Sequence, residues 1–598
     1  MSGRLVSLVS RPLARSCFLR DVRQPARTRF LSTLPNIPLF RALQSYDPAS
    51  LAIIHSVTTR SFTYGNLIAD VVRAKEDLQR KVAKSEGQLA GERVALLAEN
   101  SYDYVVTLLA IFANDAVALP LSPSFPTGEL QYILDNSQAK VLLSTEKYAQ
   151  KAQEILQAGL EREPLLDIRP KITKGATGSE AVQLEDLKQP SSGGMMLYTS
   201  GTTNRPKGVL IPDSALAAQA SSLLEAWKYA PQDRLLHLLP LHHIHGVVNA
   251  IVTPILAGSS IEFLYPFNAD QVWKRFAAPF LPSKNTDATP PKITFLNAVP
   301  TIYSRLMSSF PNLSPEIQNA AKQAISPENL RLNISGSAAL PTPTKTAWQQ
   351  LSNGNVLLER FGMTEVGMAI SCGLDFADRV DGSVGWPLPN VEVRLVDTET
   401  GAVIPPGEDT DSAGRAREGE IQIRGPTVFH KYWANEKATR EEFVASDDGG
   451  SRWFRTGDVA TRHPVEGAGK GTSGAWAKGP MYFIRGRKSV DIIKTGGEKV
   501  SALEVEREML SLPQITEAAV VALPSEKWGQ KVAAMVVLHP DAKSSRTGRA
   551  WGPMDLRRAL RDRLASYKIP QEMKVLEAIP RNAMGKVNKK ALIKEVFG

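Results

Sequence analysis

The chain has 598 residues, of which 43% are hydrophobic and 22% charged, a composition typical of a globular enzyme of two or three domains. No uninterrupted apolar run reaches the roughly 18–20 residues that a membrane span requires, because the best candidate, Tyr104–Leu121, is broken by Asn114 and Asp115. Residues 1–30 contain seven arginines and one aspartate, so their formal charge is +6. The rest of the chain therefore carries only +4 of the total net charge of +10. The remaining cations are mixed with acids, which argues against a nucleic-acid-binding protein.

The segment 1–31 has the composition of a mitochondrial transit peptide, since it is rich in Arg, poor in acids and interspersed with Leu, Val, Phe and Ser. Arg29–Ser32 resembles a matrix-protease cleavage site. A secretory signal fits less well because arginines interrupt its apolar stretch, and a disordered basic tail is the plain alternative. We therefore expect the mitochondrial matrix. Loss of Cys17 with this segment would leave Cys372 alone, so no internal disulfide is expected.

From residue 32 onward, short apolar strands alternate with amphipathic helices, a pattern that predicts βαβ units and a mostly parallel sheet. Helices are expected at 38–44 and at 102–113, the latter after a helix N-cap region at 99–101. Residues 61–67 are expected to lead from a strand into a helix that runs to about Lys84. Segment 165–192 is polar and is predicted to be irregular. The expected strands are Arg93–Leu97, Ala116–Leu121, Ala139–Ser144, 195–197, Leu235–Leu239, Ile293–Ala298 and Leu330–Ile334.

The pattern changes towards shorter alternating strands between Val391 and Tyr482, and a small α+β unit follows. The joint between them is Arg485–Asp491. The predicted organisation is a large domain at 32–487 and a small mobile lid at 488–598. Three stretches, 281–291, 405–418 and 464–480, read as loop insertions, the last of them rich in Gly and flexible.

One loop, Tyr198–Val209, gathers hydroxyls, glycines and cations directly after a buried strand. Glycine lets the backbone turn its N–H groups inward, and hydroxyl and ammonium groups donate to oxygen, so the loop suits a polyphosphate. Pro206 and Gly208 break the Walker pattern, which needs Gly and then Ser or Thr at those two places. A plain polar surface loop is the alternative. The candidate ATP-binding residues here are Thr199, Ser200, Gly201, Thr202, Thr203 and Lys207.

Three later motifs carry groups suited to a nucleotide. An aromatic ring stacks on adenine, Glu365 offers a hard oxygen ligand for Mg²⁺, and the carboxylate of Asp458 accepts strong hydrogen bonds from hydroxyls. Lys586 stands in a basic stretch near the end of the chain. Each motif alone is weak evidence for a nucleotide site, because a capped turn or a solvent-exposed basic tail can have the same sequence. The stretches are Phe361-Gly362-Met363-Thr364-Glu365, Thr456-Gly457-Asp458 and Gly585-Lys586.

Together, six signatures between residues 198 and 586 resemble, in order, those of the acyl-adenylate-forming superfamily, which joins acyl-CoA synthetases, luciferases and peptide-synthetase adenylation domains. Asn204 stands where the family has Gly. The resemblance implies an α/β fold, with parallel sheets and a small distorted β-barrel in the large domain and a mobile α+β lid. It also implies ATP, Mg²⁺ and CoA as substrates and cofactors, and Arg487 as a ribose or phosphate contact.

The same resemblance implies a reaction in two halves. A carboxylate first displaces pyrophosphate from Mg·ATP to give an acyl-adenylate, and a thiol then displaces AMP. Lys586, with Thr364 and Glu365, serves the first half, and rotation about 487–491 brings the other lid face into place for the second. Gly496 and Gly497 would let a pantetheine arm pass close to the backbone.

Cations near the predicted acyl pocket point to a substrate with two carboxylates. Arg binds a carboxylate through two parallel hydrogen bonds, whereas a fatty-acyl tunnel would be apolar. The alternative is that Glu359 or another acid of the protein neutralises the arginines. The set of Arg305, Ser337, Arg360, His243 and His245 resembles that of mitochondrial malonyl-CoA synthetases.

We therefore expect malonate as the substrate, with methylmalonate tolerated. The rivals are a medium-chain or aryl acyl-CoA synthetase of the same fold and a non-catalytic nucleotide-binding homologue. A peptide-synthetase adenylation domain is a weaker alternative, because the eight residues after Lys590 leave no room for a carrier domain.

Overall fold

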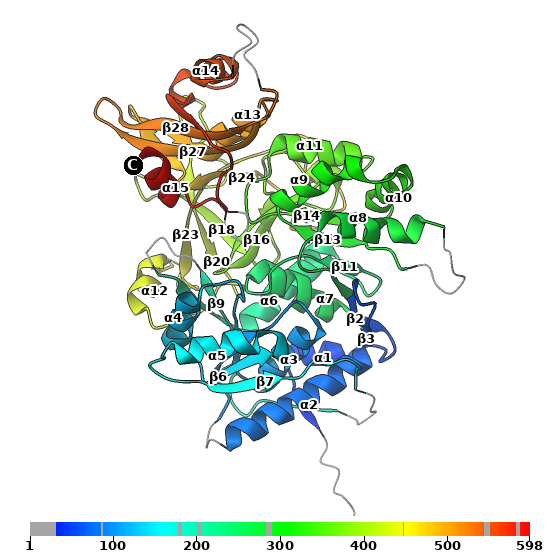
Figure 1. Cartoon of the computed structure of the whole chain (residues 1–598). Coiled ribbons are helices and arrows are strands. Elements are labelled where there is room, and N and C mark those ends of the chain that lie inside the picture. Colours follow the sequence, from blue (N-terminus) through cyan, green and yellow to red (C-terminus); the bar gives the residue numbers. More distant parts are fainter. Residues whose placement is uncertain are drawn as a thin grey trace, which may run out of the picture.

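The computed structural model describes residues 32–84, 88–176, 182–199, 205–282, 290–446, 448–542, 550–581 and 586–598. The predicted transit segment 1–31 lies outside these ranges. Within them, the strands form two large mixed sheets, an antiparallel sheet, a lid sheet and one small pair, β1 (Thr33–Pro35) with β8 (Gln183–Glu185). Figure 1 shows the lid sheet and its helices, in orange and red, at one end of the molecule.

The first large sheet has the order β21-β10-β9-β5-β4-β6-β7 and is parallel from β9 to β7. Strand β4 is wholly buried, as its continuous apolar run predicts for a strand covered on both faces. The strands are β4 (Arg93–Leu97), β5 (Val117–Pro120), β6 (Val141–Thr145), β7 (Leu165–Arg169), β9 (Gly194–Thr199), β10 (Lys207–Pro212) and β21 (Lys431–Tyr432).

Two helices of the first half, α2 and α3, begin at side-chain caps. The Thr63 side chain accepts a hydrogen bond from the backbone of Asn66, and that of Ser101 from Tyr104. The helices are α1 (Pro38–Ser45), α2 (Tyr64–Ala83), α3 (Tyr102–Ala113), α4 (Thr127–Ser137) and α5 (Ala149–Gln157). The predicted strand–helix alternation is confirmed here.

The prediction of an irregular segment at 165–192 is wrong, because that segment contains β7 and β8. Strand β7 is an edge strand paired with β6, and its polar residues are held by ion pairs rather than by an apolar face. Asp167 pairs with Lys81 at 2.6 Å and Arg169 with Asp77 at 2.6 Å. These charges hide the apolar alternation that would have identified the strand.

The second large sheet has the order β17-β16-β15-β14-β13-β11-β12-β2-β3, and it is parallel from β15 to β2. The strands are β2 (Leu51–His55), β3 (Ser61–Thr63), β11 (Arg234–His237), β12 (Ser260–Phe263), β13 (Phe295–Ala298), β14 (Leu332–Ser335), β15 (Leu358–Met363), β16 (Gly367–Ser371) and β17 (Trp386–Pro387). Its helices are α6 (Asp213–Trp227), a π-helix (His245–Val252), α7 (Thr253–Ala257), α8 (Ala269–Ala277), α9 (Pro300–Ser309), α10 (Pro315–Ile325) and α11 (Thr342–Leu351).

The third sheet is antiparallel, with the order β19-β18-β20-β23-β22, and β24 pairs with β23. Among the described strands this sheet stays open, where the family resemblance implied a small distorted barrel. Its elements are β18 (Glu392–Asp397), β19 (Val403–Ile404), β20 (Gly419–Arg424), α12 (Glu436–Glu442), β22 (Phe443–Val444), β23 (Trp453–His463) and β24 (Met481–Arg487).

Two of the predicted loop insertions, 405–418 and 464–480, contain neither helix nor strand in the structure, and 281–291 lies partly outside the described residues. The Gly-rich stretch is nevertheless fastened to the large domain, because Gly469 N and Ser473 Oγ both donate to the carboxylate of Asp378.

The lid begins after β24, where the chain leaves the third sheet at Arg487 and enters β25 at Ile492. Its sheet has the order β26-β25-β28-β27, with β29 on β28. The elements are β25 (Ile492–Thr495), β26 (Glu498–Ser501), α13 (Ala502–Leu510), β27 (Ile515–Ser525), β28 (Gly529–Leu538), α14 (Pro553–Leu560), β29 (Glu572–Val575) and α15 (Lys589–Phe597).

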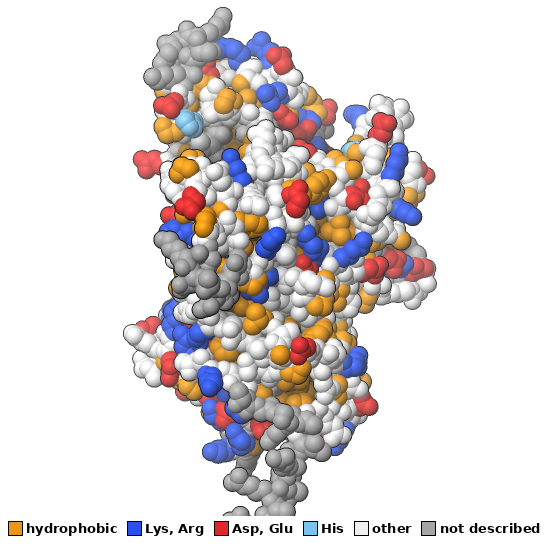
Figure 2. Space-filling view, turned by 90° about the vertical axis from the view of Figure 1, so that its right-hand side faces the viewer, with side chains coloured by type: hydrophobic (Ala, Val, Ile, Leu, Met, Phe, Trp, Pro, Cys, Tyr) orange, Lys and Arg blue, Asp and Glu red, His pale blue; other side chains and the backbone are white. Residues whose placement is uncertain are grey.

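The hydrophobic cores follow this division. One cluster runs through the first three sheets, while the lid has clusters of its own around Val520 and Ala519. Few direct contacts therefore join lid and base, among them Arg485 with Glu504 at 2.7 Å. In the part of the chain that the structure describes, no helix has the length and apolar character that crossing a bilayer would demand. On the face in Figure 2, acidic and basic side chains are interspersed.

Candidate active site

The carboxyl ends of the parallel strands in the second sheet bring together residues that are distant in sequence. Strands β11, β13, β14 and β15 run in one direction, so their ends lie along one edge of the sheet, where ligands of α/β proteins bind. His245 follows β11, Ser337 follows β14, and Arg360 lies within β15. Because Ser335 is paired with Glu359, Arg360 stands directly beside the loop that follows β14.

Arg360 is the central cation of this edge, with 5% of its surface exposed. One terminal nitrogen lies 2.8 Å from His245 Nδ1 and donates to Ser337 Oγ at 3.3 Å. A guanidinium only donates, so His245 Nδ1 is the acceptor and the imidazole carries its proton on Nε2. Burial, reinforced by the charge of Arg360, holds the pKa of His245 well below its usual range and keeps it neutral.

The loop after β14 is shaped to receive this guanidinium. A Cβ atom on Gly336 would lie 2.4 Å from Arg360 Cζ, so only glycine leaves room for the side chain. Ser337 adopts φ of 68°, in the left-handed region that few residues other than glycine occupy. The constrained backbone turns the Ser337 hydroxyl towards Arg360.

Arg360 has no carboxylate partner among the described residues. Glu359, the neutralising partner considered in the sequence, points to the other face of β15 and pairs with Lys345 at 2.7 Å. Arg379 shows how a structural arginine is satisfied in this fold, since it donates to the carbonyls of Val356 and Leu374 at 2.6 and 2.7 Å. The terminal nitrogen of Arg360 contacts only the neutral His245 and Ser337. Arg360 Nε and His245 Nε2 are buried without a described acceptor, as is Arg379 Nε.

Burial lowers the pKa of Arg360 to about 9. The group is still charged at neutral pH. A buried cation without a counter-ion is costly, and an anion bound against it would restore the balance. The edge therefore has the electrostatics of an anion site.

Two of the phosphate-loop candidates are described: Thr199 ends β9 and is paired with Lys207, the first residue of β10. Lys207 Nζ lies 4.9 Å from the centre of the Tyr432 ring, and the Tyr432 hydroxyl donates to Glu365 Oε1 at 2.9 Å. The hairpin thus approaches the adenine motif through Tyr432. The other candidates of the loop, namely Ser200, Gly201, Thr202 and Thr203, lie outside the described residues, as does Asn204.

The adenine motif forms the turn between β15 and β16. A Cβ on Gly362 would lie 2.3 Å from the carbonyl oxygen of Gly367, so the tight hairpin needs glycine at this place. Glu365 is buried, which raises its pKa, while the hydrogen bond from Tyr432 lowers it. The motif residues Phe361, Gly362, Met363 and Thr364 remain half-buried, so they are accessible to a ligand.

The antiparallel pair β23–β24 brings Asp458 directly opposite Arg487. Arg487 donates to the carbonyl of Thr456 at 3.3 Å, and its backbone N–H donates to Asp491 at 3.0 Å. Burial raises the pKa of Asp458 to about 6, although the charges of Arg487 and Lys586 oppose that rise. Asp458 is therefore largely ionised at pH 7 and above.

Lys586, which belongs to the lid, interacts electrostatically with Asp458 and Glu365 of the large domain. Loss of hydration lowers the pKa of Lys586. The negative charges of Asp458 and Glu365 raise this pKa, whereas the positive charges of Arg487 and Arg360 lower it further. Its side chain is nevertheless exposed, so it projects into space that solvent reaches. The same cation contributes to lowering the pKa of His243. The charge of Lys586 is therefore close enough to interact with Asp458, Glu365 and Arg360.

Some predicted residues lie apart from this group. Arg305 is exposed on α9, and its guanidinium lies 4.7 Å from the centre of the Phe267 ring. Gly496 and Gly497 form the exposed turn between β25 and β26, with φ of 57° and 87°, as a two-residue hairpin requires. Gly496 N donates to the carbonyl of Trp528 at 2.9 Å within the lid.

Tyr432 positions the site and was not predicted from the sequence, and the positioning roles of Gly336, Asp491 and Lys589 were not predicted either. Lys589 pairs with Asp491 at the joint and with Glu506, each at 2.6 Å, so it fastens α15 to the segment that links lid and base. Its place three residues after Lys586 is the only sequence signal for this role. Nothing local marks Tyr432, which acts through a contact with a residue 67 positions away.

The arrangement is suited to positioning and charge stabilisation rather than to covalent catalysis. Cys372 is buried, which raises its pKa to about 12, so it is no nucleophile. The described residues hold no group of three or more metal-ligating acids, histidines or cysteines. Glu365 with incoming phosphate oxygens still fits the way in which Mg²⁺ is bound in nucleotide sites, through one or two carboxylates.

Two protein-family models together match most of the chain. The model of the AMP-binding enzyme family matches residues 42–433, and that of the AMP-binding enzyme C-terminal domain matches 504–586. Among curated proteins, a CoA ligase of Gibberella moniliformis is 55% identical over 576 residues, covering 94% of each chain. The mitochondrial malonate–CoA ligase ACSF3 of Mus musculus is 38% identical over 602 residues, covering 96% of this chain and 94% of that one.

Among solved structures, ATP-bound MatB from Rhodopseudomonas palustris superposes with a TM-score of 0.74 at 30% identity. The alignment covers 94% of this chain and 98% of MatB. The predicted α/β class with parallel sheets is confirmed by this similarity.

Proposed function

The chain belongs to the AMP-binding enzyme family, and we propose that within it the enzyme joins malonate to CoA at the expense of ATP, giving malonyl-CoA, AMP and pyrophosphate. Relatives named malonate–CoA ligase support this substrate. Methylmalonate is accepted as well, because one extra methyl group discriminates by only about 1–3 kcal/mol.

The observation that carries the proposal is Arg360. It is buried, its described neighbours His245 and Ser337 are neutral, and Glu359, the acid next to it in the sequence, pairs with Lys345. Malonate has a second carboxylate that matches the donors of a guanidinium. A monocarboxylic acid would place an apolar tail against this cation and leave it unpaired. We include His243 in the proposed carboxylate set, and Arg305 as a residue that lies apart from Arg360 in this structure and would contact the acid only from the exposed side.

In the first half-reaction, one malonate oxygen attacks the α-phosphorus of ATP, and the bond to the pyrophosphate oxygen breaks. The loop between Thr199 and Lys207 holds the phosphate tail, Phe361 stacks on adenine, and Asp458 accepts from the ribose hydroxyls with Arg487 beside it. Mg²⁺, bound by Glu365 and phosphate oxygens, would neutralise charge on the leaving pyrophosphate. Lys586 stabilises the negative charge that both partners bring to the α-phosphate.

In the second half-reaction, the sulfur of CoA attacks the carbonyl carbon of the adenylate and AMP leaves. We assign Gly496 and Gly497 to the passage of the pantetheine arm, which requires the lid to rotate about 487–491. Few ion pairs oppose that rotation; among the described residues, Arg485 with Glu504 and Lys499 with Glu399 pair across the joint. Exposed pairs of this kind are each worth about 1 kcal/mol or less.

Assay of the enzyme with ATP, Mg²⁺, CoA and a panel of acids tests the substrate. We expect pyrophosphate release to be fastest with malonate, slower with methylmalonate, and weak with acetate, octanoate and benzoate. A preference for octanoate or benzoate would favour the medium-chain or aryl alternative instead. Absence of AMP formation with every acid would favour a non-catalytic homologue, against which the presence of Lys586, Asp458 and Glu365 argues.

We also propose delivery to the mitochondrial matrix, on the basis of the composition of residues 1–31 and of relatives whose names include the mitochondrion. A fluorescent protein fused behind residues 1–40 should accumulate in the matrix. Replacing the seven arginines of this segment by glutamine is the matched control and should abolish import. A fusion that stays in the cytosol would contradict the proposal.

A further inference from the structure

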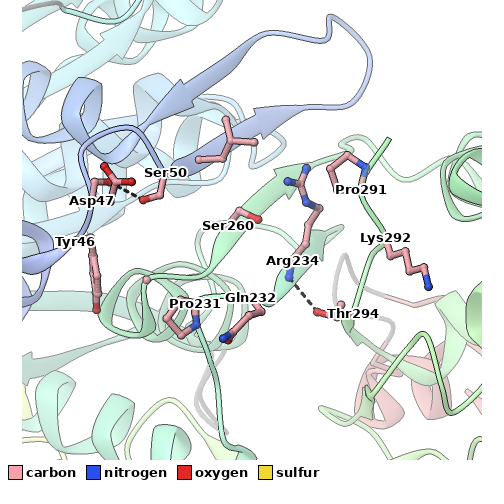
Figure 3. A pocket seen from close by; sticks show the side chains of 12 residues that line it. Tyr46, Asp47, Ser50, Pro231, Gln232, Arg234, Ser260, Pro291, Lys292 and Thr294 are labelled. Atoms are coloured by element: carbon pink, nitrogen blue, oxygen red, sulfur yellow. Dashed lines mark hydrogen bonds between the residues drawn. The ribbon is translucent and has the colours of Figure 1, made fainter. Parts of the chain in front are cut away.

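A cavity of about 580 Å³ opens at the amino edge of the second sheet, the edge opposite the active site (Figure 3). Its walls come from the beginnings of neighbouring parallel strands and from the loops that lead into them. This volume lies in the range of small-molecule sites. The polar lining residues that matter are Asp47, Ser50, Arg234, Ser260, Lys292 and Thr294.

Arg234, the first residue of β11, is the buried cation of this cavity, with 8% of its surface exposed. Its only carboxylate neighbour among the described residues is Glu262, at 3.4 Å. Arg275 holds the same carboxylate more closely, with Nη2 at 2.8 Å, and Ser56 donates to it as well. Two guanidinium groups therefore share one acid, and the positive charge of Arg234 is poorly compensated.

The remaining charges of the lining keep the balance positive. Lys292 stands at the exposed rim, where its ammonium donates to the neutral amide of Asn329 at 2.8 Å and so keeps an uncompensated charge. Asp47 is the single acid of the lining, and it accepts from the backbone of Ala49 in its own turn. In Figure 3 Asp47 lies with Ser50 on the wall away from Arg234 and Lys292.

We propose that this cavity binds a small organic anion, a carboxylate or phosphate compound, with its charged group on Arg234 and its body against Pro231, Pro291 and Leu51. A buried guanidinium that shares its only acid has donors left for such a group. The cavity is too large for a lone inorganic ion to fill. The site is separate from the proposed catalytic edge and does not depend on the identity of the acid substrate.

Calorimetric titration of the full-length enzyme with citrate tests this proposal, with inorganic phosphate as the small probe. AMP is kept saturating to occupy the catalytic edge, and chloride keeps the ionic strength constant. We expect citrate to bind more tightly than phosphate. Arg234→Gln should weaken citrate about tenfold or more, as expected for loss of a charged hydrogen bond. Asp47→Asn should strengthen it a few-fold.

Lys274→Gln, which removes an exposed charge on α8 outside the cavity, is the matched control and should leave citrate binding unchanged. Lys292→Gln gives a second, milder loss of binding if Arg234→Gln fails to fold. Unchanged citrate affinity in both lining variants would overturn the proposal. Citrate binding that disappears with saturating AMP, or binding of phosphate alone, would overturn it as well.

Discussion

Replacing Lys586 by alanine should reduce adenylate formation from malonate and ATP by about 10²–10³-fold, the loss seen when one preorganised charge-stabilising donor is removed. The physical reason is the surroundings of its ammonium group. Asp458 and Glu365 raise its pKa and so favour the charged form, while Arg487 and Arg360 lower it. The negative charges of the reacting phosphate and carboxylate favour the charged form of Lys586 further, and its ammonium group stabilises them in turn.

The effect should be confined to the first half-reaction. Thioester formation from chemically prepared malonyl-adenylate and CoA should change less than about threefold, because Lys586 is assigned to attack at the α-phosphate. Pyrophosphate release measures the first half and appearance of malonyl-CoA measures the second. Equal losses in both assays would contradict the assigned role.

Lys590→Ala supplies the matched control for Lys586→Ala. Lys590 lies four residues further on, in α15, carries the same charge and is exposed. It should retain adenylation activity within about twofold, since exposed charges remote from the reaction contribute little. If both variants lost activity alike, the basic stretch would act through lid folding and not through a placed cation.

Sequence periodicity predicted the buried parts of the fold best. Strand Arg93–Leu97 and helix Tyr102–Ala113 have the predicted bounds, because the strand is a short apolar run and the helix follows the predicted capping region 99–101. Strand β7 was missed because its inward charges are paired by tertiary contacts. The interval 200–204 and the residues 582–585 before Lys586 carry candidate motifs but lie outside the described structure.

The residue types of the candidate site could be predicted from the sequence, but the contacts between their side chains could not. The sequence places Glu359 next to Arg360, and only the alternation of β15 shows that they face opposite ways. Gly336 looks like any loop glycine until the neighbouring strand brings a guanidinium against it. Pairing across strands is set by long-range topology, so single-sequence patterns identify the groups but not their partners.

Arg360→Ala should lower kcat/KM for malonate by about 10²–10³-fold or more, since truncating one partner of a buried charged pair costs about 2–5 kcal/mol. For acetate, which has no second carboxylate to bind, the same change should cost less than about tenfold. The ratio of the two losses is the measurement. Arg360→Lys should rescue malonate only in part, because an ammonium group lacks the planar fork that binds both carboxylate oxygens.

Arg379→Ala is the matched control, because Arg379 is equally buried but donates to the carbonyls of Val356 and Leu374. Its loss should reduce thermal stability and affect malonate and acetate alike. A selective malonate defect in Arg360→Ala, absent from Arg379→Ala, would therefore separate substrate recognition from general loss of buried hydrogen bonds. Equal losses on both acids in Arg360→Ala would instead make Arg360 a structural residue, and the site would then have no buried counter-charge for a diacid.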